Sequence, residues 1–500
     1  MPKWHSIGKS LDSDEELGLF ALQTCLLSCL AKGHPVPSAS TLETTNSRCI
    51  DPVLRKLFLQ SELFVTVVCF GSSMIIKLIS SIILTRILAP EAYGIMILLM
   101  SIATFFELIS DLGMLTVMLR HERGDDQAFI NTMWTIRLIR NCVNCFLLVT
   151  LAPIIAKIFA TPELKAVIRV YAIVLIIHAC ESMSFMLAAR HRKNRIVAYI
   201  NLFATAVTTP AIIFCSLIYR DYHGMLYGII LQTLITTVAS HFFYRDRRPR
   251  IQLEPAASRD LFAFSKFVIP SSIIAMLLSQ FDKFIFLKLF DLRLFGIYGI
   301  AGGLASPATG LGDQLSRAVL FPRCAEYARS NPKTAHLNFY HNNSLIFIAI
   351  LAFPPIVAGA ADVIVQLLYD ERYAYASVIV RAFLARGVLN TLAVTTEHLL
   401  LALGFSHITL VACVLRLCWL IPGCLLGFYY FGFPGFLYAA MLEPLPQLIY
   451  LWHLQFKEGM LIVKYECLKL TFVASLFIIS YAISSQISGV ALRAFIKSFF

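Results

Sequence analysis

Long apolar segments follow one another along this chain from about residue 59 onward. Each is roughly 20 to 25 residues long, the length that a helix needs to cross about 30 Å of hydrocarbon. Only 14% of the residues are charged, whereas about a quarter are charged in a soluble domain. Because a single segment can satisfy its own backbone polar groups in lipid only as a helix, the pattern predicts an all-α polytopic membrane protein.

The segments predict twelve core spans and one or two more at the C-terminus. We expect helices near 62–88, 93–118, 129–155, 165–189, 196–218, 223–243, 260–290, 294–316, 341–368, 375–403, 407–430, 433–455 and 468–489. Residues 491–500 are too short for a dependable fourteenth span.

Residues 1–58 differ from the rest, and we interpret them as a cytoplasmic or poorly ordered N-terminal tail. A cleaved signal peptide is the alternative. Four acidic residues stand where its basic region should be, namely Asp12, Asp14, Glu15 and Glu16.

Lysine and arginine residues concentrate in alternate loops. The loops on one side hold four basic residues at 190–195 and five at 245–259, and the loops on the other side hold few. Such a bias marks the cytoplasmic side and predicts a cytoplasmic N-terminus. The net charge of +12 is therefore a signal of topology, and we expect no nucleic-acid partner.

Two stretches about two hundred residues apart share one pattern. "LTRILAPEAYGI" (84–95) and "FLKLFDLRLFGI" (286–297) each close an apolar segment, so that Arg86 matches Lys288, Tyr93 matches Phe295 and Gly94 matches Gly296. Chance similarity between two apolar helices is the alternative. Since six spans separate the copies, both halves have the same orientation, which predicts a parallel repeat about an axis along the membrane normal.

The repeat sets the predicted organisation: two six-helix lobes in pseudo-twofold arrangement around a central cavity. We expect an N-lobe at 59–244, a basic cytoplasmic linker at 245–258, a C-lobe at 259–456 and the additional span or spans at 457–500.

Polar residues inside the spans are candidates for function, because ionisable groups in a bilayer are costly and tend to face a wet cavity. Guanidinium groups suit phosphate and carboxylate. We therefore predict that an anionic head group is bound in the cavity by Lys77, Arg137, Arg140, Asn141, Asn144, Arg386 and Asn390.

Four acidic residues in the spans are candidates for cation or proton coupling: Glu107, Asp111, Asp282 and Glu397. The alternative is that these carboxylates only pair with basic residues and fasten neighbouring helices. Arg86 and Lys288 lie near span ends, where long basic side chains reach the lipid head groups.

We expect no metal and no cofactor. Cys142 and Cys145 form a CxxC pair, but no second pair accompanies them. No GxxxxGK[ST] phosphate-binding loop is present, so we do not expect this chain to use ATP itself.

Two stretches resemble a known family. "LTRILAPEAYGIMILLMSIATFFELISDLGM" (84–114) has a Pro-Glu-x-Tyr-Gly turn and a helix that ends in Asp-Leu-Gly, and "LSQFDKFIFLKLFDLRLFGIYGIAGGLASP" (278–307) precedes "LSRAVLFPRCAEY" (315–327). They are similar to polysaccharide transporters, the Wzx-type oligosaccharide flippases of the multidrug/oligosaccharidyl-lipid/polysaccharide exporter superfamily. Phe295 departs from the usual Leu, and the first 55 residues have no counterpart.

The resemblance implies a function. It is the translocation of a polyprenyl-diphosphate-linked oligosaccharide, for O-antigen, capsule or exopolysaccharide, from the inner to the outer leaflet of the bacterial cytoplasmic membrane by alternating access. Membrane lipids, a glycan polymerase and chain-length machinery are the partners it suggests. The matching residues Tyr93, Gly94, Asp111, Gly113 and Asp282 are expected to be structural, and no enzymatic activity is expected.

Other functions stay open at this point. An ion-coupled exporter of drugs or small molecules would favour an acidic, aromatic cavity, whereas this chain offers arginines. A membrane glycan polymerase or ligase would need a sizeable outer loop, and the loops predicted outside are short. A scaffold without transport is the third alternative.

Overall fold

The computed structural model describes residues 62–488, apart from 192, 243–248, 333 and 406. The predicted tail 1–58 and the short segment 491–500 lie outside the described residues. The chain divides into two compact units, Met1–Val67 and Val68–Phe500, and the contacts reported below lie within the second. Every regular element in the described part is helical.

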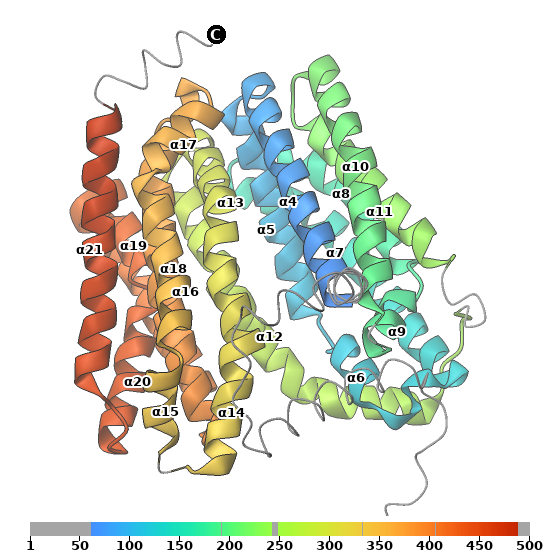
Figure 1. Ribbon diagram of the computed structural model, residues 1–500. Helices are drawn as coiled ribbons and strands as arrows, with labels where there is room; N and C mark the ends of the chain where they lie inside the picture. Colours follow the sequence, from blue (N-terminus) through green and yellow to red (C-terminus); the bar gives the residue numbers. More distant parts are fainter. Residues whose placement is uncertain (1–61, 192, 243–248, 333, 406, 489–500) are drawn as a thin grey trace, which may run out of the picture. The chain divides into compact units, whose positions relative to one another are not determined.

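The predicted N-lobe contains eight α-helices among the described residues (Figure 1). They are α4 (Glu62–Ile87), α5 (Pro90–Ile109), α6 (Met114–Arg120), α7 (Gln127–Ile158), α8 (Leu164–Ala179), α9 (Ser184–Arg190), α10 (Asn194–Tyr219) and α11 (His223–Ser240). Helix α7 packs on α8, α8 on α11 and α11 on α10.

The remaining helices form the predicted C-lobe and the additional span. They are α12 (Pro255–Leu289), α13 (Leu292–Leu315), α14 (Phe321–Ser330), α15 (Ala335–Asn342), α16 (Ser344–Gly359), α17 (Ala361–Leu368), α18 (Ala376–Ala402), α19 (Ile408–Met441), α20 (Leu445–Lys457) and α21 (Val463–Ser488). Helix α18 packs on α13, α16 and α20, and α21 lies along α16 (Figure 1).

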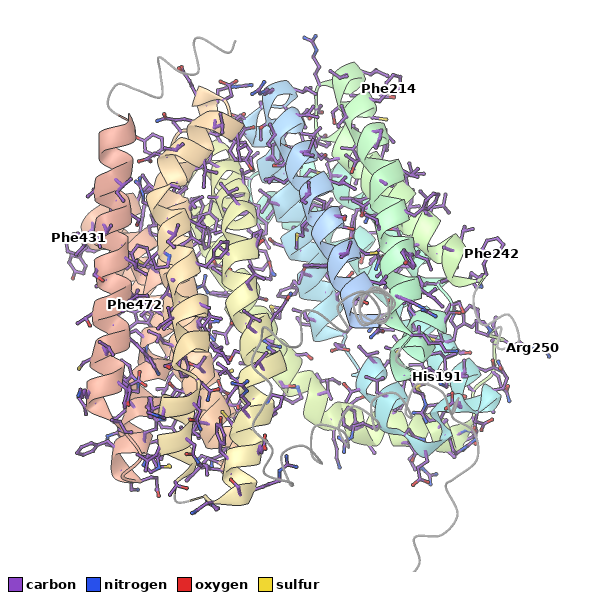
Figure 2. The ribbon with its side chains drawn as sticks, in the orientation of Figure 1. His191, Phe214, Phe242, Arg250, Phe431 and Phe472 are labelled. Carbon is purple, nitrogen blue, oxygen red and sulfur yellow. The ribbon has the colours of Figure 1, made fainter. Side chains whose placement is uncertain are left out.

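Most of the predicted spans coincide with these helices. The predicted span 93–118 is broken at residues 110–113, between α5 and α6, and the predicted span 223–243 (α11) is not among the helices long and apolar enough to cross a membrane. Among the described residues, eight helices are long and apolar enough to cross a membrane, or up to eleven if each of three bent pairs is one span. The stretch Ile408–Lys457 counts once, although the backbone leaves the helix at Gly432 (φ 63°, ψ −141°), between two predicted spans. The surface fits a lipid environment, because side chains such as Phe214 and Phe431 point outward and are 65% and 75% exposed (Figure 2). The chain is a multi-pass membrane protein.

The Asp-Leu-Gly motif makes the turn between α5 and α6. Gly113 has φ 66°, a left-handed conformation that glycine adopts without strain. The Asp111 carboxylate accepts a hydrogen bond from the Gly113 amide at 2.9 Å and another from the Ser272 hydroxyl of α12 at 3.3 Å. Asp111 therefore shapes the turn and ties it to α12.

The described part of the linker is fastened to the start of α7. The Gln252 and Glu254 amides donate to the hydroxyls of Thr135 and Thr132, each at 3.0 Å. Arg123 donates to both the Glu254 and the Asp126 carboxylates, and its guanidinium lowers the pKa of Asp126, which therefore stays ionised over the physiological range. The linker thus leads α12 directly beneath the N-lobe helices.

The two copies of the repeat meet at the first turns of α5 and α13. A Cβ added to Gly296 would lie 1.9 Å from the Pro90 carbonyl oxygen, and one added to Gly94 would lie 2.4 Å from the Leu292 carbonyl oxygen. In the repeat, Pro90 corresponds to Leu292 and Gly94 corresponds to Gly296. The two contacts are therefore equivalent, as a pseudo-twofold axis requires. The two-lobe, parallel-repeat fold is confirmed, and the glycines permit the two backbones to touch.

The same end of the bundle, which we call the crossing end, is closed by hydrogen bonds between the lobes. The Tyr373 hydroxyl donates to the Leu88 carbonyl at 3.1 Å, and Arg372 donates to the Arg86 carbonyl at 3.3 Å. Lys288 donates to the Ile158 carbonyl, rather than only reaching toward head groups. The final carbonyls of a helix lack partners within it, so C-lobe side chains here satisfy the ends of α4 and α7.

We predict that Gly296→Ala destabilises the protein by about 1–3 kcal/mol, because the new methyl group must push two backbones apart. Gly303→Ala on the same helix is the control, since its added Cβ meets nothing within 4 Å. The measurement is thermal unfolding of both purified variants in detergent. Equal unfolding temperatures would show that the close crossing does not need glycine.

Candidate functional site

Four of the predicted N-lobe residues lie on α7, which packs on α8 and α5: Arg137, Arg140, Asn141 and Asn144. Arg137 is 4% exposed and forms a buried ion pair with Glu181. Its guanidinium also lies 3.1 Å from the His178 carbonyl oxygen and 3.3 Å from the His178 ring nitrogen Nε2. Arg137 is therefore held, through its Nη2, by the last turn of α8 and by Glu181 in the segment that joins α8 to α9.

Arg140 lies one helical turn further along α7 and is not paired in this way. Its Nη2 donates to the Asn141 side chain at 3.2 Å, but its Nε is buried without a hydrogen-bond partner. The Nδ2 of Asn141 is likewise buried and unpartnered. Leaving a buried donor unsatisfied costs about 1–3 kcal/mol. The pair therefore leaves two buried donors without a hydrogen-bond partner among the described residues.

The polar groups around Arg140 come from α5 and from α7 itself. Glu107 and Asp111 attract the Arg140 charge, whereas Arg137 repels it. The Asn144 side chain donates to the Ser110 hydroxyl at 2.8 Å. Asp111 already accepts two hydrogen bonds in its turn, and the Glu107 side chain is exposed, its carboxylate making no hydrogen bond with the described residues.

The predicted C-lobe residues form a second, separate cluster. Arg386 of α18 lies between two carboxylates, 3.4 Å from Asp282 and 3.2 Å from Glu443. Glu443 is fully buried and also pairs with Arg416, and the Tyr298 hydroxyl donates to Asp282 at 2.9 Å. Two guanidinium groups thus balance two carboxylates, which joins α12, α18 and α19 to the segment before α20.

The other two predicted C-lobe residues also have partners. The Asn390 side chain donates to Asp313 at 3.2 Å. Glu397 accepts from the Thr409 hydroxyl at 2.6 Å and from the Gln447 side chain at 2.8 Å. Both residues therefore fasten α18 to its neighbours within the C-lobe.

Lys77 is placed apart from both clusters. It is exposed on α4, and it makes no hydrogen bond or ion pair with the described residues. One helical turn further along α4, the Ser81 hydroxyl lies 3.4 Å from the hydroxyl of Tyr369, the residue that follows α17. This contact holds α4 against the C-lobe. The prediction that Lys77, Arg137, Arg140 and Arg386 act together stays a prediction, since no contact among the described residues joins the two clusters.

A cavity between the lobes contains a basic residue that the sequence analysis did not select. The cavity has a volume of about 410 Å³ and is lined by α4, α5, α10, α11 and α12. Lys283 of α12 lines it beside Gln280, whose side chain accepts from the Lys283 amine at 2.9 Å. No carboxylate in the described part of the chain forms an ion pair with Lys283. We call this space the interlobe cavity.

The signal for Lys283 was present in the sequence, as a basic residue within a span. It directly follows Asp282, which the sequence analysis did select. On a helix adjacent side chains point in different directions, and here Asp282 turns into the C-lobe while Lys283 turns into the interlobe cavity. Among the described residues no group of three His, Cys, Asp or Glu could hold a metal ion.

The chain matches a family model described as polysaccharide biosynthesis protein over residues 83–378. It is 20% identical over 310 residues to the teichuronic acid biosynthesis protein TuaB of Bacillus subtilis, covering 60% of this chain and 62% of that protein. The match therefore spans less than two thirds of that relative's length.

Solved structures show the same fold. The lipid II flippase MurJ in an inward closed conformation is 12% identical with a TM-score of 0.64, covering 84% of this chain and 92% of that one. An inward-facing multidrug resistance MATE family transporter of the MOP superfamily is 14% identical with a TM-score of 0.56, covering 85% of this chain and 99% of that one.

We predict that Arg137→Leu destabilises the protein by about 3–5 kcal/mol, because Glu181 would remain buried without its partner. Adding Glu181→Leu should restore most of that loss. Arg140→Leu is the control, since it removes a guanidinium with no ion-pair partner. The free energy of unfolding in denaturant is the measurement, and equal losses for Arg137→Leu and Arg140→Leu would contradict this division of roles.

Proposed function

Because the chain belongs to the polysaccharide biosynthesis protein family, we propose that it moves a polyprenyl-diphosphate-linked oligosaccharide from one membrane leaflet to the other. The glycan is a repeat unit of O-antigen, capsule or exopolysaccharide. The head group of such a lipid cannot cross hydrocarbon unaided, since its charges and hydroxyls would lose their hydration without replacement.

The observation that carries this proposal is the pair of unsatisfied donors on α7. Arg140 Nε and Asn141 Nδ2 are buried without partners, whereas the other buried guanidinium groups of the two clusters already face carboxylates. A diphosphate supplies the acceptor oxygens that these donors lack. Lys283, which forms no ion pair with the described residues, places a further positive charge in the interlobe cavity, which Arg140 and Asn141 do not line.

The contacts at the crossing end support alternating access. They include one close backbone crossing, apolar packing such as that of Tyr93 on Tyr373, and hydrogen bonds to carbonyl groups that water can replace. With the N-terminus in the cytoplasm, this end faces the outside of a bacterial cytoplasmic membrane. We propose that it separates when the head group is released, with a glycan polymerase and chain-length machinery acting on the product.

The four acidic residues divide within this proposal. Asp111, Asp282 and Glu397 each accept hydrogen bonds that hold helices together. The Glu107 carboxylate accepts none from the described residues and lies near Arg140, so it is the candidate we retain for cation or proton coupling.

We predict that Arg140→Gln lowers surface polysaccharide by about tenfold or more, because hydrogen bonds to a charged group contribute about 1.5–3 kcal/mol each. The protein should remain in the membrane at its normal level. Surface polysaccharide is quantified against membrane-protein abundance in cells that carry only the variant.

Arg86→Gln is the matched control, since the Arg86 side chain is exposed and donates no hydrogen bond to a described residue. It should leave polysaccharide nearly unchanged. Normal polysaccharide in the Arg140→Gln strain would refute the anion site and, with it, the present basis for the function.

A further inference from the structure

The segment that leads into α12 exposes apolar side chains at the end of the bundle opposite the crossing end. Ile251 is 78% exposed, Leu253 is 54% exposed, and Phe262 in the first part of α12 is 55% exposed. Single apolar residues on a surface are ordinary, but several gathered on one short segment indicate a surface that meets something other than water.

The backbone of this segment turns the two aliphatic side chains outward. The amides of Arg250, Gln252 and Glu254 donate to side chains of α7, each at 3.0 Å. The side chains of Gln252 and Glu254 also bond to the N-lobe. Because successive side chains of an extended chain point to opposite sides, Ile251 and Leu253 point away from the N-lobe.

The first arm of α12 continues this surface. The arm, Pro255–Lys266, is bent by 47° from the rest of the helix and lies across the end of the bundle, against α6 (Figure 1). Ala257 and Leu261 are buried in a cluster with apolar residues of α6 and α7, whereas Arg259 and Phe262 are exposed. A helix with basic and aromatic residues on its outer face is typical of helices that lie in the membrane interface.

Two arginines accompany the exposed apolar residues. Arg250 points away from the bundle (Figure 2), Arg259 is exposed, and neither forms an ion pair with a described residue. Glu254 and Asp260, the carboxylates of the same segment, already face basic residues of the N-lobe. The surface therefore keeps a positive charge that an anionic partner would neutralise. We call these exposed residues the linker surface: Arg250, Ile251, Leu253, Arg259 and Phe262.

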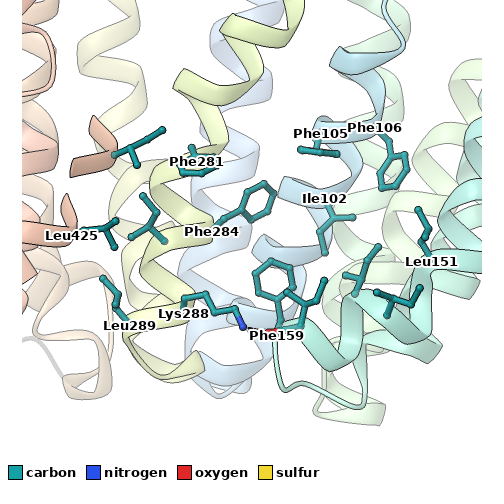
Figure 3. Close-up of a pocket in the computed structure, with 15 residues that line it drawn as sticks. Ile102, Phe105, Phe106, Leu151, Phe159, Phe281, Phe284, Lys288, Leu289 and Leu425 are labelled. Carbon is teal, nitrogen blue, oxygen red and sulfur yellow. Dashed lines mark hydrogen bonds between the residues drawn. The ribbon is translucent and has the colours of Figure 1, made fainter. Parts of the chain in front are cut away.

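A groove elsewhere in the bundle shows the contrast with a purely apolar surface (Figure 3). It has a volume of about 660 Å³, and Lys288 is the one charged residue among the 15 that line it. The linker surface instead combines arginines with apolar side chains over residues 250–262. This mixture suits the head-group region of a bilayer, where apolar side chains reach the acyl boundary and guanidinium groups meet phosphate.

We propose that the linker surface lies in the membrane interface and binds anionic phospholipid. Ile251, Leu253 and Phe262 enter the acyl boundary, and Arg250 and Arg259 bind the lipid phosphates. The site anchors the junction between the two lobes to one leaflet, and it does not depend on which substrate the protein carries. In the predicted orientation this leaflet is the cytoplasmic one, whose anionic lipids attract basic segments near the surface.

The test is photo-crosslinking of the full-length protein in vesicles of equal parts phosphatidylglycerol, which is anionic, and phosphatidylcholine, which is not, with one or the other lipid radiolabelled. Benzoylphenylalanine replaces Leu253 or, as the matched control, Leu337 on α15, a leucine of similar exposure at 49%. We expect a several-fold preference for phosphatidylglycerol adducts at position 253 and little preference at position 337. An equal preference at the two positions would overturn the inference.

The absence of any lipid adduct at position 253 would also overturn the inference. The linker surface would then face the aqueous phase, and an acidic protein partner would be the occupant that its charge favours.

Charge variants test the role of the two arginines. In the Arg250→Gln, Arg259→Gln double variant, the preference at position 253 should fall to that at position 337, while phosphatidylcholine adducts remain. Raising the salt concentration from about 0.1 M to about 1 M should act in the same direction, because the Debye length falls from about 10 Å to about 3 Å. An undiminished preference in the double variant would contradict recognition of the anionic lipid by these arginines.

Discussion

The contact between the first turns of α5 and α13 is the constraint on which the remaining structure depends. Carbonyl oxygens of Pro90 and Leu292 approach Gly296 and Gly94 so closely that no side chain fits between them. In the conformation described here, this crossing holds the two halves of the repeat together at one end. It also places α5 beside α12, and both of these helices line the interlobe cavity.

The charged residues in the membrane divide according to whether they have partners. Some positive charges are neutralised by ion pairs within one lobe. Glu181 pairs with Arg137, and Asp282 and Glu443 pair with Arg386 and Arg416. Removing one member of such a pair leaves a buried charge, so these residues hold the lobes in shape. Arg140 and Lys283 are not compensated in this way, and an anionic substrate would provide what they lack.

Much of the fold could be predicted because its signals are local. Apolar segments of spanning length gave helices, the break at Gly432 falls between two predicted spans, and the matched glycines meet at the pseudo-twofold crossing. The candidate site was less accessible to prediction. The polar stripe on α7 was visible from helical spacing, but the partner of Arg137 lies 44 residues away and that of Arg386 lies 57 residues away. Spacing along one helix carries no information about partners on another.

The sequence by itself determined that this chain is a helical membrane protein with two similarly oriented halves, because hydrophobicity and helical periodicity act within each segment. Only the tertiary structure decided which charged groups are neutralised, since an ion pair depends on distances of a few ångströms between different helices. It also decided that neighbouring residues such as Asp282 and Lys283 face different surroundings. A side chain's chemical role follows from what the fold places against it, and that is set by packing between segments.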